Sequence, residues 1–163
     1  MKEAEHIYNG ATTSREIPAA VVRYLDGTDL LKKTQALRLS TVDSDGWPHA
    51  ALLSAGDIVI MPSGHIRFAL FPKSTMTSNL ERAGRLTIAL SLDGGICELR
   101  LRSRRLANAA PDVPLAFFEG EVETVRQHVA PYANVTGGVE FSLHEPQSVL
   151  PRWQRQIAAL RVA

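Results

Sequence analysis

The sequence predicts a mainly β protein, a small antiparallel β-barrel with peripheral helices. Two observations support this fold class. Between Leu37 and Arg105, apolar and polar residues alternate in successive short segments, which is the period of half-buried strands. One passage, residues 72–80, interrupts these segments with a pattern typical of a short helix. The 163 residues suffice for a single domain with its own core, and no repeat or linker divides the chain.

The residues before these strands predict a mobile arm and two covering helices. The arm comprises residues 1–13, and a helix follows over residues 14–25 and ends at Asp26-Gly27. The apolar positions of this helix share one face: Ile17, Val21, Val22 and Leu25. Thr28 is placed to cap a second short helix over residues 29–36.

The strands of the predicted barrel are joined by recognisable turn residues. They run over residues 37–42, 48–54, 57–61, 65–71, 85–92 and 96–106. Asp43-Ser44-Asp45-Gly46 and Asp93-Gly94-Gly95 have the composition of hairpin turns. A helix over residues 74–83, ended by Gly84, connects the fourth of these strands to the fifth.

The last third of the chain predicts a helix, a strand and a second helix. Helical spacing of apolar residues predicts a helix over residues 114–129, which Pro131 ends. The residues with this spacing are Leu115, Phe118, Val122, Val125 and Val129. A strand is expected over residues 139–143, and residues 149–162 have the pattern of an amphipathic helix.

Charge and targeting signals exclude some function classes. A formal net charge of +1 gives no electrostatic reason to bind nucleic acid or an acidic membrane surface. The arginines at positions 100, 102, 104 and 105 are interpreted as a solvated strand face or a subunit contact. The N-terminal residues lack the apolar run of a signal peptide, and no stretch has the length of a membrane span, so we expect a cytoplasmic protein.

Cysteine and histidine usage gives no metal or redox site. The single cysteine, Cys97, excludes an internal disulfide and lies in an apolar strand, where a buried inert thiol is expected. The five histidines are scattered without metal-ligand spacing, so no metal is predicted. No Ser-His-Asp order is apparent, and no catalytic residue is predicted.

The passage at residues 72–80 is the best candidate for a binding site. It turns from a strand into a helix through the hydroxyl residues Ser74, Thr75 and Thr77. The first N–H groups of a helix have no intrahelical partner and lie at the positive end of the helix dipole, so they can bind a phosphate. The same hydroxyl residues could do no more than cap the helix, and the sequence does not separate these two readings.

Five motifs, taken in order, resemble one known family. They are LSTVDSDGWPH at 39–49, FALF at 68–71 before a serine-containing turn, NLER at 79–82, RLTI at 85–88 and LRLR at 99–102. Their order and spacing over residues 37–106 are similar to those of the pyridoxamine 5'-phosphate oxidase-like flavin proteins. The resemblance implies an antiparallel, Greek-key-like split barrel. It also implies a homodimer that binds FMN in two symmetric grooves between its subunits.

The resemblance assigns site residues position by position. The flavin would be lined by the second hairpin strand and the end of the strand at 65–71, which gives Ala51, Leu52, Leu53, Ser54, Leu70 and Phe71. The phosphate would be held by the following turn, which gives Lys73, Ser74, Thr75 and Thr77.

The chain departs from the family pattern at two places. Thr75 and Met76 stand where family members commonly have arginine and lysine. The tail after Leu143 does not match the basic and aromatic segment with which the true oxidases hold pyridoxal phosphate. We therefore expect an FMN-dependent oxidoreductase acting on an unidentified small molecule, in which FMN carries the hydride, and not a pyridoxamine phosphate oxidase. The alternative is a non-catalytic dimeric protein that binds a flavin or another cofactor.

Overall fold

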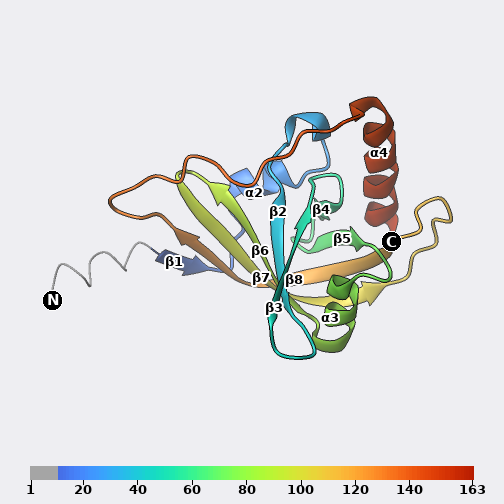
Figure 1. Cartoon of the computed structure of the whole chain (residues 1–163), viewed down its shortest axis with the longest axis horizontal. Coiled ribbons are helices and arrows are strands. Elements are labelled where there is room, and N and C mark those ends of the chain that lie inside the picture. The colour runs from blue at the N-terminus through green and yellow to red at the C-terminus, as the bar shows by residue number, and fades with distance from the viewer. Residues whose placement is uncertain (1–10) are drawn as a thin grey trace.

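The computed structural model describes residues 11–163, which form the predicted antiparallel β-barrel (Figure 1). Eight strands make one curled sheet in the order β3-β2-β6-β7-β8-β5-β4, and β1 pairs with β8 beside this path. The strands are β1 (Ala11–Ser14), β2 (Leu37–Val42), β3 (Pro48–Leu53), β4 (Ile58–Ile60), β5 (Ile66–Leu70), β6 (Arg85–Leu92), β7 (Gly95–Leu106) and β8 (Ala116–His128). All pairings are antiparallel.

The core lies inside the curl of the sheet. Alternate residues of β2 and β7 point inward and are buried, as the two-residue period predicts. Phe68 of β5 and Phe118 of β8 stack at the centre, with ring centroids 5.7 Å apart. Cys97 is buried in this cluster, and burial, together with the neighbouring charge of Glu98, raises the pKa of its thiol to about 11. The expectation of an inert, buried thiol is therefore confirmed.

The predicted helix after β5 is present as α3 (Thr75–Ala83). Ser74 caps it, because its Oγ accepts a hydrogen bond from the N–H of Thr77 (3.1 Å), and Gly84 ends it with φ of 64°. On the inner side, Asn79 Nδ2 donates to Thr41 Oγ1 of β2 (2.9 Å). Arg82 donates both to Asn79 and to the carbonyl of Val42. These bonds fix α3 to the β2–β3 hairpin.

The covering helices before the barrel are only partly as predicted. The first, predicted over residues 14–25, is confirmed only as α2 (Ala19–Tyr24), and Val22 of its predicted apolar face is exposed. The second is wrong, because residues 29–36 contain only a short 3-10 turn, η1 (Leu30–Lys32). Thr28 does not cap it: the N–H and the hydroxyl of Thr28 both donate to Asp26 Oδ1, at 2.8 and 2.7 Å. Asp29 then adopts a left-handed conformation with φ of 49°.

The N-terminal arm ends earlier than predicted. Residues 1–10 lie outside the described part of the chain, but Ala11–Ser14 form strand β1. This strand pairs with the second half of β8, from Val125 to His128.

The helix predicted over residues 114–129 is wrong, because this segment forms strand β8. The register of β8 against β7 shifts between Arg100 and Leu101, where Arg100 pairs with Thr124 and Leu101 pairs with Val122. A β-bulge thus inserts Glu123 as an unpaired residue. In β8, the residues whose side chains point into the barrel have even numbers before the bulge and odd numbers after it. The resulting spacing of three, from Val122 to Val125, imitates a helix in the sequence.

The predicted C-terminal helix is confirmed as α4 (Pro146–Val162), with Trp153, Ile157 and Leu160 buried. The segment between β8 and α4 crosses the top of the molecule in Figure 1. The strand predicted over 139–143 within it is reduced to one bridge, between Gln35 and Glu140. Among the described residues, no helix is long and apolar enough to cross a membrane.

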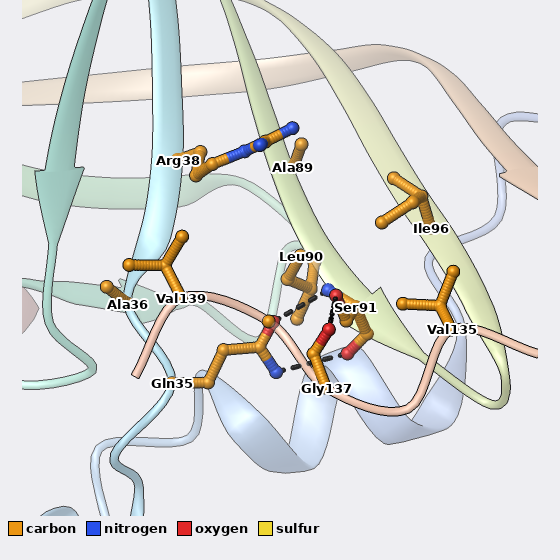
Figure 2. A pocket seen from close by; sticks show the side chains of 11 residues that line it. Gln35, Ala36, Arg38, Ala89, Leu90, Ser91, Ile96, Val135, Gly137 and Val139 are labelled. Carbon is orange, nitrogen blue, oxygen red and sulfur yellow. Dashed lines mark hydrogen bonds between the residues drawn. The ribbon is translucent and has the colours of Figure 1, made fainter. Parts of the chain in front are cut away.

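Ser91 of β6 forms hydrogen bonds both to Gln35, which precedes β2, and to the crossing segment, as Figure 2 shows. Gln35 Nε2 donates to the carbonyl of Ser91 (3.1 Å), and the N–H of Ser91 donates to Gln35 Oε1 (2.6 Å). The hydroxyl of Ser91 donates to the carbonyl of Gly137 (3.0 Å). A small, mainly apolar cleft of about 230 Å³ remains between this segment and the outer face of β2 and β6.

The C-terminal end of α4 is held by a buried ionic group. Arg67 donates from Nε to Glu119 Oε2 (2.8 Å) and from Nη1 to the carbonyl of Leu160 (2.9 Å). Arg104 Nη2 donates to the other oxygen of Glu119 (2.7 Å). The hydrogen bond from Arg67 holds the pKa of Glu119 below its ordinary value of 4.5, against the opposing effect of burial. Glu119 therefore positions the arginine that caps α4.

We predict that Glu119→Gln lowers the free energy of unfolding by about 1–3 kcal/mol at pH 7, because the largely buried Arg67 loses its charged partner, as does the exposed Arg104. A carboxylate whose pKa is lower in the folded chain stabilises it above the unfolded pKa and loses this effect as the pH falls through the native value. The difference between wild type and variant should therefore shrink below about pH 4.5.

Urea unfolding at several pH values measures this difference. Glu123→Gln is the matched control, since Glu123 pairs with Arg102 on the exposed face of the sheet and should cost less than about 0.5 kcal/mol. A difference for Glu119→Gln that stays constant down to pH 3 would contradict the assignment.

Candidate functional site

A cavity with a volume of about 740 Å³ lies between the barrel and α4. One wall is made by β3 and by the end of β5, together with the first turn of α3. The facing wall is made by α4 and by two loop segments, residues 112–115 and 139–143. Its volume lies within the range of about 300–1,000 Å³ that is usual for small-molecule sites, and most of its lining is apolar.

Eight of the ten predicted cofactor residues line this cavity. They are Ala51, Leu52, Leu53, Ser54, Leu70, Phe71, Ser74 and Thr75. The structure thus brings the two predicted groups, the flavin residues and the phosphate turn, to a single cavity. Lys73 and Thr77 are the two that do not line it.

The first turn of α3 presents unpaired donors at one end of the cavity. The N–H of Thr77 is taken by Ser74 Oγ, and the N–H of Ser78 bonds to the carbonyl of Ser74 (3.2 Å). The N–H groups of Thr75 and Met76 have no acceptor among the described residues. Both residues line the cavity, where the positive end of the helix dipole lies. This geometry suits a phosphate or a carboxylate.

The structure gives Thr77 and Lys73 different positions from those that the resemblance implied. Thr77 is 1% exposed, and its hydroxyl donates to the carbonyl of Phe71 (2.7 Å). It therefore holds the turn in shape from inside, and its hydroxyl proton is already used. Lys73 is exposed beside the turn and is absent from the cavity lining.

A buried polar network supports the other side of the cavity, and sequence reasoning missed it. Asp57 Oδ2 accepts from the N–H and the hydroxyl of Ser54, at 3.0 and 2.6 Å. Asp57 Oδ1 accepts from Gln156 Nε2 of α4 (2.9 Å), which also donates to the carbonyl of Gly56 (3.2 Å). Gln156 lies 99 residues from Asp57, so the sequence carries no local signal of this contact.

Trp153 fixes α4 as a wall of the cavity. Its indole is 4% exposed and meets the ring of Phe141 edge to face, with centroids 6.3 Å apart. The indole ring packs so closely on Gly56 that a Cβ atom added to this glycine would lie 2.1 Å from Trp153 Cγ. The amphipathic pattern of residues 149–162 predicted the helix, but the packing of Trp153 against Gly56 depends on the whole fold.

No metal centre forms in the part of the chain that the structure describes. No group of three or more histidine, cysteine, aspartate or glutamate side chains there could hold an ion. His49 does line the cavity, as a single imidazole on β3.

Comparison with known proteins gives one relative by sequence and several structures by fold. The chain is 38% identical over 146 residues to the uncharacterized protein YclD of Bacillus subtilis (strain 168), covering 84% of this chain and 90% of that protein. No protein-family model matches the chain.

Two of the solved structures that match illustrate the shared fold. A candidate pyridoxamine 5'-phosphate oxidase of Lactobacillus delbrueckii aligns with a TM-score of 0.53 and 16% identity, covering 69% of this chain and 94% of that one. HupZ of Group A Streptococcus aligns with a TM-score of 0.54 and 15% identity, covering 73% of this chain and 99% of that one. At these identities the likeness concerns the fold.

We predict that Gly56→Ala lowers the free energy of unfolding by about 1–3 kcal/mol, because the new methyl group would overlap the Trp153 ring and displace α4. Urea unfolding and tryptophan fluorescence measure the loss and the change at the indole. Gly137→Ala is the control, since no atom lies within 4 Å of the added Cβ there. Equal stability of Gly56→Ala and wild type would show that α4 does not pack as described.

Proposed function

We propose a function on two premises: the chain belongs to the same protein family as YclD of Bacillus subtilis, and it has the split-barrel fold of the pyridoxamine 5'-phosphate oxidase-like proteins. The cavity binds FMN, and the protein is an FMN-dependent oxidoreductase acting on a small organic molecule. The proposed location is the cytoplasm. Oxidation of pyridoxamine phosphate is not the proposed activity, because the C-terminal helix does not match the segment that holds this substrate in the true oxidases.

One observation carries this proposal. The cavity joins an apolar wall to two unpaired N–H groups, those of Thr75 and Met76, at a helix N-terminus. FMN has the matching two parts, a flat ring system and a phosphate. Leu53 and Leu70 line the apolar part, and the hydroxyls of Ser74 and Thr75 lie at the polar end. The donor set therefore fits the cofactor that the resemblance implies.

The protein's own task in such a reaction is to bind and orient. FMN supplies the hydride transfer when bound. The N–H groups of α3 would hold the phosphate, and the leucines of β3 and β5 would exclude water from the ring. The hydrogen bonds that Ser54 and Gln156 donate hold the Asp57 carboxylate in a fixed position in the cavity lining. This division explains why the sequence shows no acid and base pair.

A second candidate function rests on the departure at Thr75 and Met76. Met76 is 2% exposed and packs in the core, so it offers no charge to a phosphate. A protein with fewer charge-assisted contacts would bind FMN more weakly. The corresponding function is a non-catalytic dimer that uses the cavity for a flavin or another cofactor.

The homodimer is also part of the proposal, and exposed apolar residues support it. Trp47 and Phe71 are 71% and 73% exposed, and Val42 and Leu52 are about half exposed. They lie on the β2–β3 hairpin and at the end of β5, and Leu52 and Phe71 also line the cavity. Apolar groups gathered near a ligand site are typical of an interface. A second copy placed there would cover the cavity.

The arginine face of β7 needs no such partner. Arg102 pairs with Glu123, Arg104 with Glu119 and Arg105 with Glu81. Arg100 Nε lies 3.3 Å from Glu98 Oε1. Acidic residues of the same chain thus compensate this cluster. Of the two interpretations of the cluster, a solvated face is the one that these pairs favour.

We predict that Thr75→Glu weakens FMN binding at least tenfold and changes riboflavin binding less than twofold. The new carboxylate would lie at the helix N-terminus, where it would repel the phosphate that riboflavin lacks. Titration followed by flavin fluorescence measures both affinities, with wild type expected to prefer FMN.

Ser78→Glu is the matched control for this prediction. Ser78 lies one turn further along α3, is exposed and does not line the cavity. This variant should keep the wild-type preference for FMN. If wild type bound FMN and riboflavin equally, the phosphate would not lie at α3, and if neither bound, the flavoprotein assignment would be wrong.

For the homodimer we predict that Trp47→Glu shifts the protein toward monomer by at least tenfold in dissociation constant, because it places a charge in an apolar interface. Sedimentation velocity at micromolar concentration measures the change. Tyr132→Glu is the control, since Tyr132 is 79% exposed in the crossing segment, away from the hairpin. A wild-type protein that sediments as a monomer would refute the interface.

A further inference from the structure

Helix α4 presents two arginines to the cavity, Arg152 and Arg155. They are three residues apart and so lie on the same face of the helix. Arg155 Nε is 4.0 Å from Asp112 Oδ2, with both side chains more than half exposed. Arg152 makes no hydrogen bond or ion pair with any residue from 11 to 163. The Arg152 guanidinium is thus open to a ligand, and that of Arg155 is held only by an exposed ion pair at 4.0 Å.

The backbone that carries these arginines is firmly placed. Trp153 between them packs on Gly56, and Gln156 after them bonds to Asp57 and to the carbonyl of Gly56. Arg67 holds the far end of the helix. Because the backbone of α4 is already fixed, only the two arginine side chains become ordered when a ligand binds, and this limits the loss of conformational entropy.

Three carboxylates line the cavity together with the two arginines, and they are engaged differently. Both oxygens of Asp57 accept hydrogen bonds, from Ser54 and from Gln156. Asp112 is the ion-pair partner of Arg155. The charge of Glu140 acts on Tyr24, whose pKa is raised mainly by burial and further by this charge. Arg152 is therefore the lining arginine without an ion-pair partner among residues 11–163.

We propose that Arg152 and Arg155 bind the carboxylate of the substrate, so that the substrate is an organic acid with a flat apolar body. This inference rests on the proposed function and adds a substrate class to it. A guanidinium is planar and binds a carboxylate through two parallel hydrogen bonds. Arg152, which has no ion-pair partner among residues 11–163, supplies the positive charge that faces the carboxylate. Leu115 and Trp153 line the cavity nearby and supply apolar contacts for the rest of the molecule.

The test uses benzoate as a probe and benzamide as its neutral counterpart. Each is titrated into the FMN-loaded protein and followed by calorimetry and by the flavin difference spectrum. Wild type should bind benzoate at least tenfold more tightly than benzamide. Arg152→Gln and Arg155→Gln should each weaken benzoate binding about tenfold while leaving FMN affinity unchanged. Arg23→Gln is the control, because Arg23 is an exposed helical arginine outside the cavity and should change neither affinity.

Three outcomes would overturn the inference. Loss of FMN affinity in Arg152→Gln or Arg155→Gln would assign the arginines to the cofactor's phosphate. Tight FMN binding without benzoate binding would leave the proposed function intact and remove the substrate class. Preference for benzylamine, lost in Asp112→Asn, would show that the acidic residue selects a cation. If FMN fails to bind, calorimetry on the protein without FMN still tests the arginines, and arginine-dependent benzoate binding would support the anion site alone.

Discussion

The long antiparallel pair of β7 and β8 is the constraint on which the rest of the structure depends. On one side β7 carries β6 and, through it, the β2–β3 hairpin. On the other side β8 is shared, with residues 116–120 pairing with β5 and residues 125–128 pairing with β1. The bulge lies between these two halves and reverses which residues point inward. Gly120 of β8 leaves room for the side chain of Leu101 on β7, because a Cβ atom added to this glycine would lie 2.5 Å from Leu101 Cδ2.

This division of β8 determines where the cavity lies. Because β5 pairs only with the first half of β8, the chain leaves the sheet at Leu70 and turns directly into α3. The apolar end of β5 and the N-terminus of α3 therefore lie side by side, because only a short turn separates them in the chain. The same half of β8 supplies Glu119, which positions Arg67 and through it the end of α4. Both walls of the cavity thus depend on one end of one strand.

The sequence predicted the part of this arrangement that local patterns encode. Alternation identified the strands from Leu37 to Leu106, and the hydroxyl cap and the glycine stop identified α3. The pattern failed at β8, where the bulge gives the apolar residues a helix-like spacing. It also failed at Thr28, because the Thr28 hydroxyl donates a hydrogen bond to Asp26 and does not cap a helix. Eight of the ten predicted site residues meet in one cavity. The sequence could not show that Thr77 uses its hydroxyl inside the turn, nor that α4 returns to the cavity from 99 residues away.

The change at Met76 illustrates how packing and binding compete at this turn. In the structure Met76 belongs to the main core with Leu80, and a lysine at the same position would have to bury or displace its ammonium group. The apolar side chain therefore ties the first turn of α3 to the core, and Met76 also lines the cavity. Backbone donors do not depend on side-chain identity and cannot titrate, so the turn retains two unpaired N–H groups without the basic residues. The two arginines of the cavity lie on α4, where Arg155 pairs with Asp112 and Arg152 has no ion-pair partner among residues 11–163. The anion site proposed at α3 therefore relies on backbone donors, whereas the carboxylate site proposed at α4 relies on side chains that a single substitution can remove.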